Sequence, residues 1–132
     1  MRDVQYRTAC GGRRIGGSIM KMISAIIKPF KVEEVREALA QVGVTGITIC
    51  EARGYGHQRL RADARPDRNF TVEFVPKVKV DVILDAGLLP HAIEAIMKAG
   101  RTGKRGDGMI LVIDLEDTVR IRTGETGALA VA

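Results

Sequence analysis

The stretch MISAIIKPFKVEEVREALAQVG, residues 22–43, contains a strand followed by a helix. Its first part, residues 22–28, is an apolar run of strand length that ends at Pro29. Residues 31–42 then repeat apolar side chains at i, i+3, i+7 and i+10, which is the spacing of one helix face. These side chains are Val32, Val35, Leu39 and Val42. Gly43 follows where a C-capping glycine belongs, so the helix is predicted to end there.

The rest of the chain contains two loops, further strands and a second helix. Residues 45–53 are rich in β-branched side chains, which favour a strand, whereas the charged segment 55–69 has no period and is predicted to be a long loop. Residues 70–84 alternate apolar and polar positions, which predicts a strand interrupted by Pro76. The remaining segments are predicted to be a helix over 87–99, a Gly-rich basic loop over 101–108, a strand over 109–115 and a short fifth strand over 119–123.

This order of elements predicts an α+β fold. The sequence reads βαββαβ with a long loop between the second and third strands, which is the split-βαβ or ferredoxin-like arrangement with both helices on one face of an antiparallel sheet. The other face of the sheet has no helix to cover it. Because the alternate strand residues are still largely apolar, that face is expected to be buried by other copies of the chain.

Composition limits the classes of protein that the chain can represent. At 132 residues and 45% hydrophobic content, it is long enough for one domain with a core, and no apolar run approaches the roughly 20 residues that span a bilayer. Residues 1–19 carry +3 of the net charge of +5 and lack apolar periodicity, so they are expected to be a disordered or non-native extension before a domain at 20–132. With a net charge of only +2 in the rest of the chain and 4% aromatic residues, nucleic-acid binding is disfavoured. Cys10 and Cys50 are expected to be free thiols of a cytoplasmic protein.

Three polar, Gly-rich segments are candidates for ligand binding. In residues 54–58 (GYGHQ) two close glycines let backbone N–H groups approach an anion, and residues 102–108 (TGKRGDG) add basic side chains to three glycines. In residues 120–125 (RIRTGE) alternation along an extended chain would place Arg120 and Arg122 on one side, where guanidinium groups can grip phosphate oxygens. Ordinary turns or surface charge are alternative explanations of each segment, so no single one identifies a ligand.

The combination of these motifs resembles the nitrogen-regulatory PII signalling proteins from end to end. The resemblance covers essentially everything after Met20. It rests on IIKPFKVEEVREAL (26–39), TGIT (45–48), GYGHQ (54–58), FVPKVKVDV (74–82), TGKRGDG (102–108) and RIRTGE (120–125). It implies a trimer of ferredoxin-like units whose sheets face inward, in which ATP and ADP compete for clefts between subunits.

The resemblance also implies which residues would bind the nucleotide. Gly106, Asp107 and Gly108 of one subunit would contact the phosphates together with two arginines of a neighbour, while the nucleoside would lie near Thr48 and Asp81, the latter in place of a more usual Glu. The complete set of expected nucleotide-binding residues is Thr48, Gly54, Gly56, His57, Gln58, Asp81, Thr102, Gly106, Asp107, Gly108, Met109, Arg120 and Arg122.

A second ligand, 2-oxoglutarate, is implied in the same way. In the family it binds beside ATP through a bridging Mg²⁺. Gln58 would coordinate the metal, because Mg²⁺ prefers oxygen ligands and readily combines phosphate with a side chain. Lys77 would pair with the dicarboxylate as a point charge, and Gly56 would complete the site.

Two departures from the family pattern affect this expected site. Met109 follows the GDG turn where a phosphate-binding Lys is usual, and His57 stands where Arg is usual. Loss of a charged hydrogen bond costs about 1.5–3 kcal/mol when nothing replaces it. Lys104 and Arg105 are close enough in sequence to be candidates for that replacement.

The long loop is the expected contact with a partner protein. Its basic residues are Arg59, Arg61, Arg65 and Arg68. Family members use this loop on ammonium channels, glutamine synthetase regulators and N-acetylglutamate kinase, but the arginine that enters the channel corresponds to Pro66 here. A membrane transporter or an enzyme of nitrogen metabolism is therefore expected without a choice between them. The tyrosine that many bacterial members uridylylate corresponds to Phe70, which has no hydroxyl group for that reaction.

Other functions compete with the nitrogen sensor. The main alternative is a divergent energy sensor that binds adenine nucleotide without 2-oxoglutarate and regulates a non-ammonium transporter or an enzyme. A slow ATPase is disfavoured because His57 and His91 are isolated and no nucleophile is evident. A trimeric metal-binding relative is disfavoured because the sequence has no His/Cys cluster.

Overall fold

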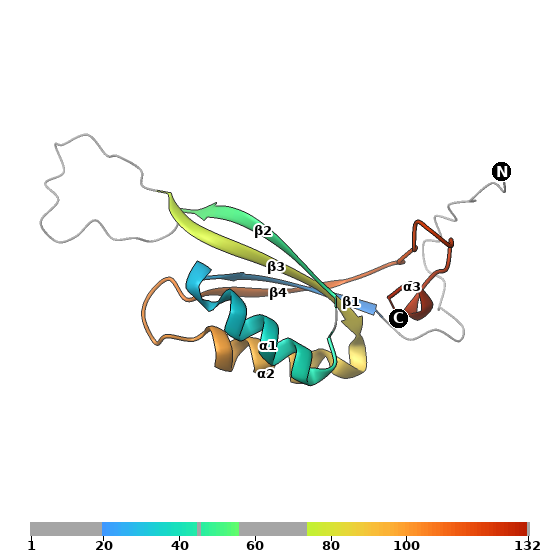
Figure 1. The fold of residues 1–132 in the computed structure, drawn as a ribbon, viewed down its shortest axis with the longest axis horizontal. Helices are drawn as coiled ribbons and strands as arrows, with labels where there is room; N and C mark the ends of the chain where they lie inside the picture. The colour runs from blue at the N-terminus through green and yellow to red at the C-terminus, as the bar shows by residue number, and fades with distance from the viewer. Residues whose placement is uncertain (1–19, 45, 56–73, 132) are drawn as a thin grey trace, which may run out of the picture.

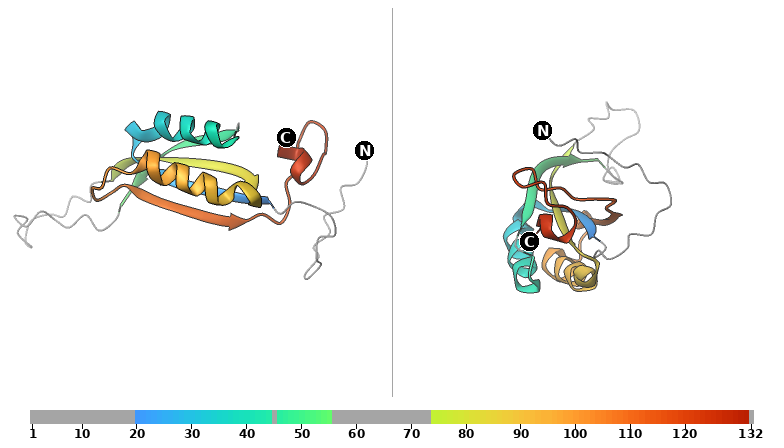
Figure 2. Two further views of the ribbon diagram at one scale, coloured as in Figure 1. Left: turned by 90° about the horizontal axis from the view of Figure 1, so that it is seen from below. Right: turned by 90° about the vertical axis from the view of Figure 1, so that its right-hand side faces the viewer.

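The structure, a computed structural model, describes residues 20–44, 46–55 and 74–131. In chain order the elements are β1 (Met20–Ile27), the 3-10 turn η1 (Pro29–Lys31), α1 (Val32–Val42), β2 (Ile47–Gly54), β3 (Val75–Asp85), the 3-10 turn η2 (Ala86–Leu88), α2 (Leu89–Gly100), β4 (Gly108–Asp114) and α3 (Ala128–Val131). The four strands form one antiparallel sheet in the order β2-β3-β1-β4, and α1 and α2 cover one of its faces (Figures 1 and 2). The predicted ferredoxin-like α+β fold is confirmed.

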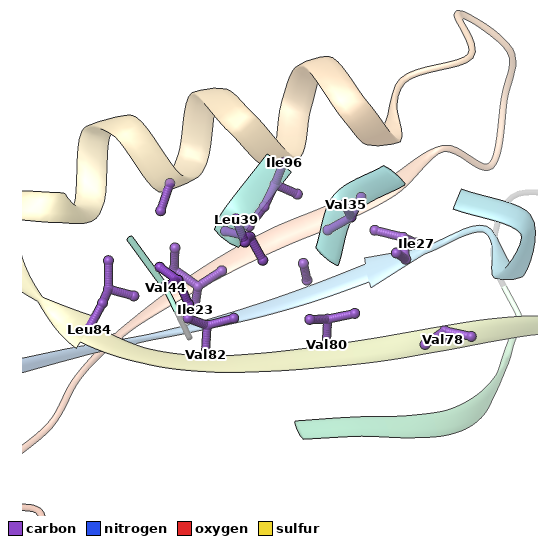
Figure 3. Packing of buried hydrophobic residues seen from close by; sticks show 12 residues of the cluster. Ile23, Ile27, Val35, Leu39, Val44, Val78, Val80, Val82, Leu84 and Ile96 are labelled. Atoms are coloured by element: carbon purple, nitrogen blue, oxygen red, sulfur yellow. The ribbon is translucent and has the colours of Figure 1, made fainter. Parts of the chain in front are cut away.

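The hydrophobic core lies between the sheet and the two helices (Figure 3). Alternate residues of a strand share one face, so the two central strands β1 and β3 each direct every second side chain toward the helices. The core cluster consists of Ile23, Ala25, Ile27, Val35, Leu39, Val44, Val78, Val80, Val82, Leu84, Ala92 and Ile96. Among the described helices, none is long and apolar enough to cross a membrane.

The end of α1 follows the sequence prediction. Gly43 adopts the left-handed conformation with φ of 102°, and its N–H donates to the carbonyl of Ala40 at 3.1 Å. The N–H of Val44 donates to the carbonyl of Leu39 at 3.0 Å, so carbonyls of the last turn are satisfied. This glycine cap turns the chain back toward β2, the edge strand beside β3.

The prediction that Pro76 interrupts a strand is wrong. β3 runs through this residue, which lies opposite Arg53 of β2. The pairing of β1 with β3 extends only as far as Ile27 opposite Val78, so Pro76 lies beyond the end of β1. A proline, which lacks an N–H donor, is tolerated where a strand has no partner on one side. The first residues of the predicted strand, 70–73, lie outside the described residues.

The predicted short strand over residues 119–123 is also wrong. Val119 and Thr126 form an isolated antiparallel bridge, and the chain between them turns back on itself. The N–H of Arg120 donates to the carbonyl of Glu125 at 2.9 Å, and the N–H of Gly124 donates to the carbonyl of Arg120 at 2.8 Å. Hydrogen bonds within this turn replace the pairing with the sheet that a fifth strand would have needed.

The face of the sheet opposite the helices carries apolar side chains, as expected. Strand alternation places on it Met22, Ile26, Ile83, Met109, Leu111 and Ile113. Large parts of Ile83, Met109, Leu111 and Ile113 are exposed in the single chain. Neither α1 nor α2 lies over this face (Figure 2). The predicted trimer would cover it, and that oligomeric state stays a prediction.

Candidate functional site

The loop from Arg101 to Asp107, which joins α2 to β4, is held by its own aspartate. The carboxylate of Asp107 accepts hydrogen bonds at Oδ2 from the N–H groups of Thr102 and Gly103, both at 2.9 Å. Its Oδ1 accepts from the hydroxyl of Thr102. The Thr102 hydroxyl above all, with further hydrogen bonds from the Thr102 and Gly103 amides and from Lys28, holds the pKa of Asp107 well below its usual range. Asp107 is therefore a charged carboxylate whose oxygens are used to shape the loop.

Two glycines give the loop its sharp path. Gly106 and Gly108 have φ of +88° and +107°, a region that L side chains rarely adopt. A Cβ atom on Gly108 would overlap the carbonyl oxygen of Ile26 and would lie 2.7 Å from the carbonyl carbon. Glycine is thus required where β4 begins beside β1. The sequence motif GDG therefore has a structural basis in this chain.

Lys28, which the sequence analysis did not single out, contacts this loop. Its ammonium group donates to the hydroxyl of Thr102 at 3.0 Å and forms an ion pair with Oδ1 of Asp107 at 3.2 Å. The residue directly follows β1 and precedes the proline of η1. A lysine between a strand and a proline carries no sequence signal that would link it to a loop 74 residues later. Only the pairing of β1 with β4 brings the two together.

Lys77, the residue expected to hold 2-oxoglutarate, reaches the same loop from β3. Its ammonium group donates to the carbonyl of Gly106. Its aliphatic part crosses Gly54 at the end of β2, where an added Cβ would lie 3.1 Å from Cγ of Lys77. Three predicted site residues from different segments, Gly54, Lys77 and Gly106, are therefore neighbours in the fold. All lie at the end of the sheet where β2 ends and where β3 and β4 begin (Figure 1).

The two residues expected near the nucleoside lie opposite each other in the sheet. Thr48 of β2 pairs with Asp81 of β3, which in turn pairs with Ser24 of β1, on the face without helices. Asp81 forms an ion pair with Lys79 at 3.5 Å through Oδ2. Its Oδ1 and the hydroxyl oxygen of Ser24 are buried and have no hydrogen-bond partner among the described residues. Asp81 thus has unused acceptor capacity beside Thr48.

A shallow, mostly apolar groove of about 380 Å³ lies between α2 and β4. Three of the predicted nucleotide-binding residues, Asp107, Gly108 and Met109, line its end near the loop. Met109 itself is largely exposed on the face without helices, where it pairs with Ile26 of β1. Its thioether offers no charge to a phosphate. Any cationic contact at the loop must therefore come from other residues.

The two arginines expected to contact phosphate do not lie near the loop of the same chain. β4 runs from the loop to the opposite end of the sheet, and Arg120 and Arg122 follow beyond that end (Figure 1). The prediction that both guanidinium groups share one side of an extended chain is wrong, because residues 121–123 form a turn. Arg120 donates through Nε to the carbonyl of Ala130 at 3.2 Å. A single chain therefore cannot combine these arginines with Gly106–Gly108.

Several predicted residues fall outside the described part of the chain. These are Gly56, His57, Gln58, Arg59, Arg61, Arg65 and Arg68, so the metal ligand and the partner loop have no structural description. The described residues on either side of this segment, Tyr55 and Phe74, carry exposed aromatic rings whose centroids are 6.1 Å apart. Within the described residues, no group of three or more His, Cys, Asp or Glu side chains could hold a metal ion, and Cys50 is an exposed free thiol.

Comparisons with known proteins agree on one family. The family model described as nitrogen regulatory protein P-II matches residues 20–125. Nitrogen regulatory protein P-II of Azospirillum brasilense is 50% identical over 112 residues, which is 85% of this chain and 100% of the relative. The protein of that description from Mesorhizobium japonicum is 52% identical over the same shares. A crystal structure of Arabidopsis thaliana PII bound to citrate matches with a TM-score of 0.71 at 32% identity, over 88% of this chain and 95% of that one.

Proposed function

Because the chain belongs to the nitrogen regulatory protein P-II family, we propose that it is a trimeric, non-catalytic sensor that binds ATP or ADP between its subunits. The observation that carries the proposal is the loop of residues 101–107. The carboxylate of Asp107 accepts hydrogen bonds from the N–H groups of Thr102 and Gly103 and so holds the loop together. Gly106 and Gly108 turn the main chain without side chains in the way. Turns of this kind bind phosphate groups through main-chain donors.

The positions of the arginines support a site shared between subunits. Arg120 and Arg122 lie beyond the opposite end of β4 from the loop, so one chain supplies only part of a phosphate site. A second copy packed against the apolar face without helices would bring its own C-terminal turn to the first copy's loop. Two copies would then combine the main-chain turn with bidentate guanidinium donors, which are well suited to phosphate.

The loss of the usual lysine at Met109 does not leave the loop without cations. The ammonium group of Lys77 and the aliphatic end of Lys28 both approach Gly106: an added Cβ at Gly106 would lie 3.3 Å from Nζ of Lys77 and 3.8 Å from Cε of Lys28. Lys28 is paired with Asp107, so Lys77 is the nearby positive charge that favours a bound anion. We therefore expect the protein to keep measurable affinity for ADP and ATP.

Lys77 also supports 2-oxoglutarate as a second ligand beside the nucleotide. Its ammonium group lies at Gly106 and its stem lies over Gly54, so a dicarboxylate paired with it would be adjacent to the nucleotide phosphates. Gln58 would supply a side-chain oxygen to Mg²⁺, a cation that prefers oxygen ligands. The citrate in the Arabidopsis thaliana structure is also a polycarboxylate, which agrees with a carboxylate effector.

Ligand binding would control a partner protein through residues 56–73. β2 ends at Gly54, Tyr55 is the last described residue before this segment, and Phe74 is the first after it, so the proposed ligands lie at the base of the loop. A ligand that binds one loop conformation better than another shifts the populations by its difference in affinity. The partner is proposed to be a membrane transporter or an enzyme of nitrogen metabolism, reached by the arginines of the loop.

Calorimetric titration of the full chain tests this function. ADP is titrated first, then ATP with Mg²⁺, with and without 2-oxoglutarate. If ATP binds and 2-oxoglutarate binds only in its presence, the proposal is supported. If nucleotide binds but 2-oxoglutarate never does, the protein is instead the divergent energy sensor. If no nucleotide binds at all, the sensor function is wrong although the family membership stands.

A further inference from the structure

Lys28 is connected to the loop of residues 101–107 by a hydrogen bond to Thr102 and an ion pair with Asp107. The hydroxyl of Thr102 accepts hydrogen bonds from Nζ of Lys28 at 3.0 Å and from the N–H of Lys104 at 3.2 Å, and it donates to Asp107. A hydroxyl group has one donor and two acceptor positions, so Thr102 is fully used. The orientation of this hydroxyl, and with it the loop, depends on the ammonium group of Lys28.

The same lysine neutralises the carboxylate that folds the loop. Asp107 receives hydrogen bonds from Thr102 and Gly103 and an ion pair from Lys28 at 3.2 Å. The side chain of Lys28 is 17% exposed and that of Asp107 is 26% exposed, so water screens this pair only in part. Without the lysine, an uncompensated negative charge would stand one residue from Gly106 and Gly108, where the phosphates are proposed to bind.

We propose that Lys28 is a positioning residue of the nucleotide site: it holds Asp107 and Thr102 so that the main chain at Gly106–Gly108 keeps its anion-binding shape. This role rests on the proposed function and deepens it. It differs from direct contact with a ligand, because the lysine acts through Asp107. It also assigns a task to a side chain that precedes the loop by more than 70 residues.

A double-mutant cycle measured by ADP titration of the full chain tests this role. Lys28→Met keeps most of the aliphatic stem and removes the charge, and we expect it to weaken ADP binding about tenfold or more, as loss of a charged hydrogen bond does. In an Asp107→Asn background the same substitution should change ADP affinity less than about threefold, because its partner charge is already gone. Lys21→Met, which removes a paired lysine at the other end of β1, is the matched control and should leave ADP affinity unchanged.

Amide hydrogen exchange without nucleotide gives a second readout that does not depend on binding. Lys28→Met should speed exchange at the N–H groups of Thr102 and Gly103, which donate to Asp107. Lys28→Gln removes the charge but keeps a polar side chain of similar length, and it should have the same effect, so it decides the matter where Lys28→Met does not fold.

The outcomes separate this inference from the function on which it rests. Unchanged ADP affinity and unchanged exchange in Lys28→Met would overturn the positioning role. Equal loss of affinity in both backgrounds would overturn it too, because the lysine would then act directly on the ligand. If the wild-type chain itself fails to bind ADP, the proposed function fails. The exchange rates of Thr102 and Gly103 then still decide whether Lys28 holds the loop.

Discussion

Gly108 is the residue at which the candidate site and the fold depend on each other. It begins β4, lies opposite Ile27 of β1, and has φ of +107°. A side chain there meets the backbone carbonyl of Ile26, which cannot move without breaking the central strand pair. Gly103 in the same loop has φ of +81° but open space around it. A side chain at Gly103 would therefore cause backbone strain alone, whereas one at Gly108 would cause backbone strain and steric overlap.

We predict that Gly108→Ala destabilises the protein much more than Gly103→Ala. The control should cost about 1–2 kcal/mol, which is the penalty for a left-handed L residue. Gly108→Ala adds overlap with the main chain of Ile26 and should exceed it by at least about 2 kcal/mol. Urea denaturation followed by circular dichroism measures both. Equal stabilities for the two variants would contradict the steric requirement at Gly108.

The lowered pKa of Asp107 predicts a specific acid sensitivity. In the folded chain the hydroxyl of Thr102, the loop amides and Lys28 keep this carboxylate charged, whereas in the unfolded chain it takes up a proton near pH 3.8. The unfolded state then binds more protons, so the stabilisation is complete above about pH 4 and is lost as the pH falls below it. Asp107→Asn should flatten the fall of unfolding free energy below pH 4. A variant whose acid profile parallels the wild type would count against this assignment.

At the residue scale, the sequence could predict a glycine-rich loop at residues 101–108 but not the side chain that supports it, and phosphate binding there stays a prediction. The spacing of Gly106 and Gly108 with Asp107 between them is a local pattern, and such patterns can be read directly. The contact of Lys28 with Thr102 depends on strand pairing over a long sequence separation. The prediction of an extended chain at residues 120–122 is wrong because an alternation of charged and apolar side chains over three residues is too short to distinguish a strand from a turn.

At the scale of elements, the helices follow from their apolar spacing and their ends. The pattern at residues 31–42 and the glycine after it give α1 within a residue, and the predicted helix over 87–99 agrees with α2 after its 3-10 start. The predicted break at Pro76 is wrong because the effect of a proline on a strand depends on which strands lie beside it. The sequence alone does not give these neighbours, which are set by the strand order of the sheet. Elements set by local periodicity could thus be predicted, whereas those set by pairing could not.

Two neighbouring residues of α2 should differ sharply in their effect on stability. Ile96 points into the core with 2% of its surface exposed, while Met97 is 46% exposed (Figure 3). Ile96→Ala leaves a cavity between α2 and the sheet and should cost about 2–5 kcal/mol. Met97→Ala should cost less than about 1 kcal/mol. Unfolding free energies from urea titration compare the pair, and similar losses would mean that α2 does not bury Ile96 as described.

At the scale of the whole molecule, the main feature is the face of the sheet without helices, whose apolar side chains are exposed in a single chain. Met109, Leu111 and Ile113 of β4 share this face, and each keeps at least 40% of its surface exposed. Apolar side chains arranged on one face of a sheet are typical of a surface that another chain covers. If Arg120 and Arg122 bind the same phosphates as the loop of residues 101–107, as proposed above, their position beyond the opposite end of β4 also calls for a second copy.

We predict that Leu111→Glu breaks the assembly without unfolding the chain. Leu111 lies in the middle of β4 on the uncovered face, opposite Ser24 of β1. A buried carboxylate at a subunit contact is unfavourable, so light scattering coupled to size exclusion should show a trimer for the wild type and a monomer for the variant. Met97→Glu introduces the same group on an exposed part of α2 and should remain trimeric. A trimer with Leu111→Glu would place the contact elsewhere.

The separation of Arg122 from Gly108 along one chain has a genetic consequence. In the proposed assembly each cleft takes its loop from one copy and its arginines from the next. A chain damaged at Gly106 of the same loop, where an added side chain meets only the ends of two lysines, and a chain damaged at Arg122 would each fail to bind nucleotide alone. Mixed in one trimer, the loop of the second and the arginine of the first would form an intact cleft. Two defective alleles expressed together should therefore restore nucleotide binding that neither shows by itself.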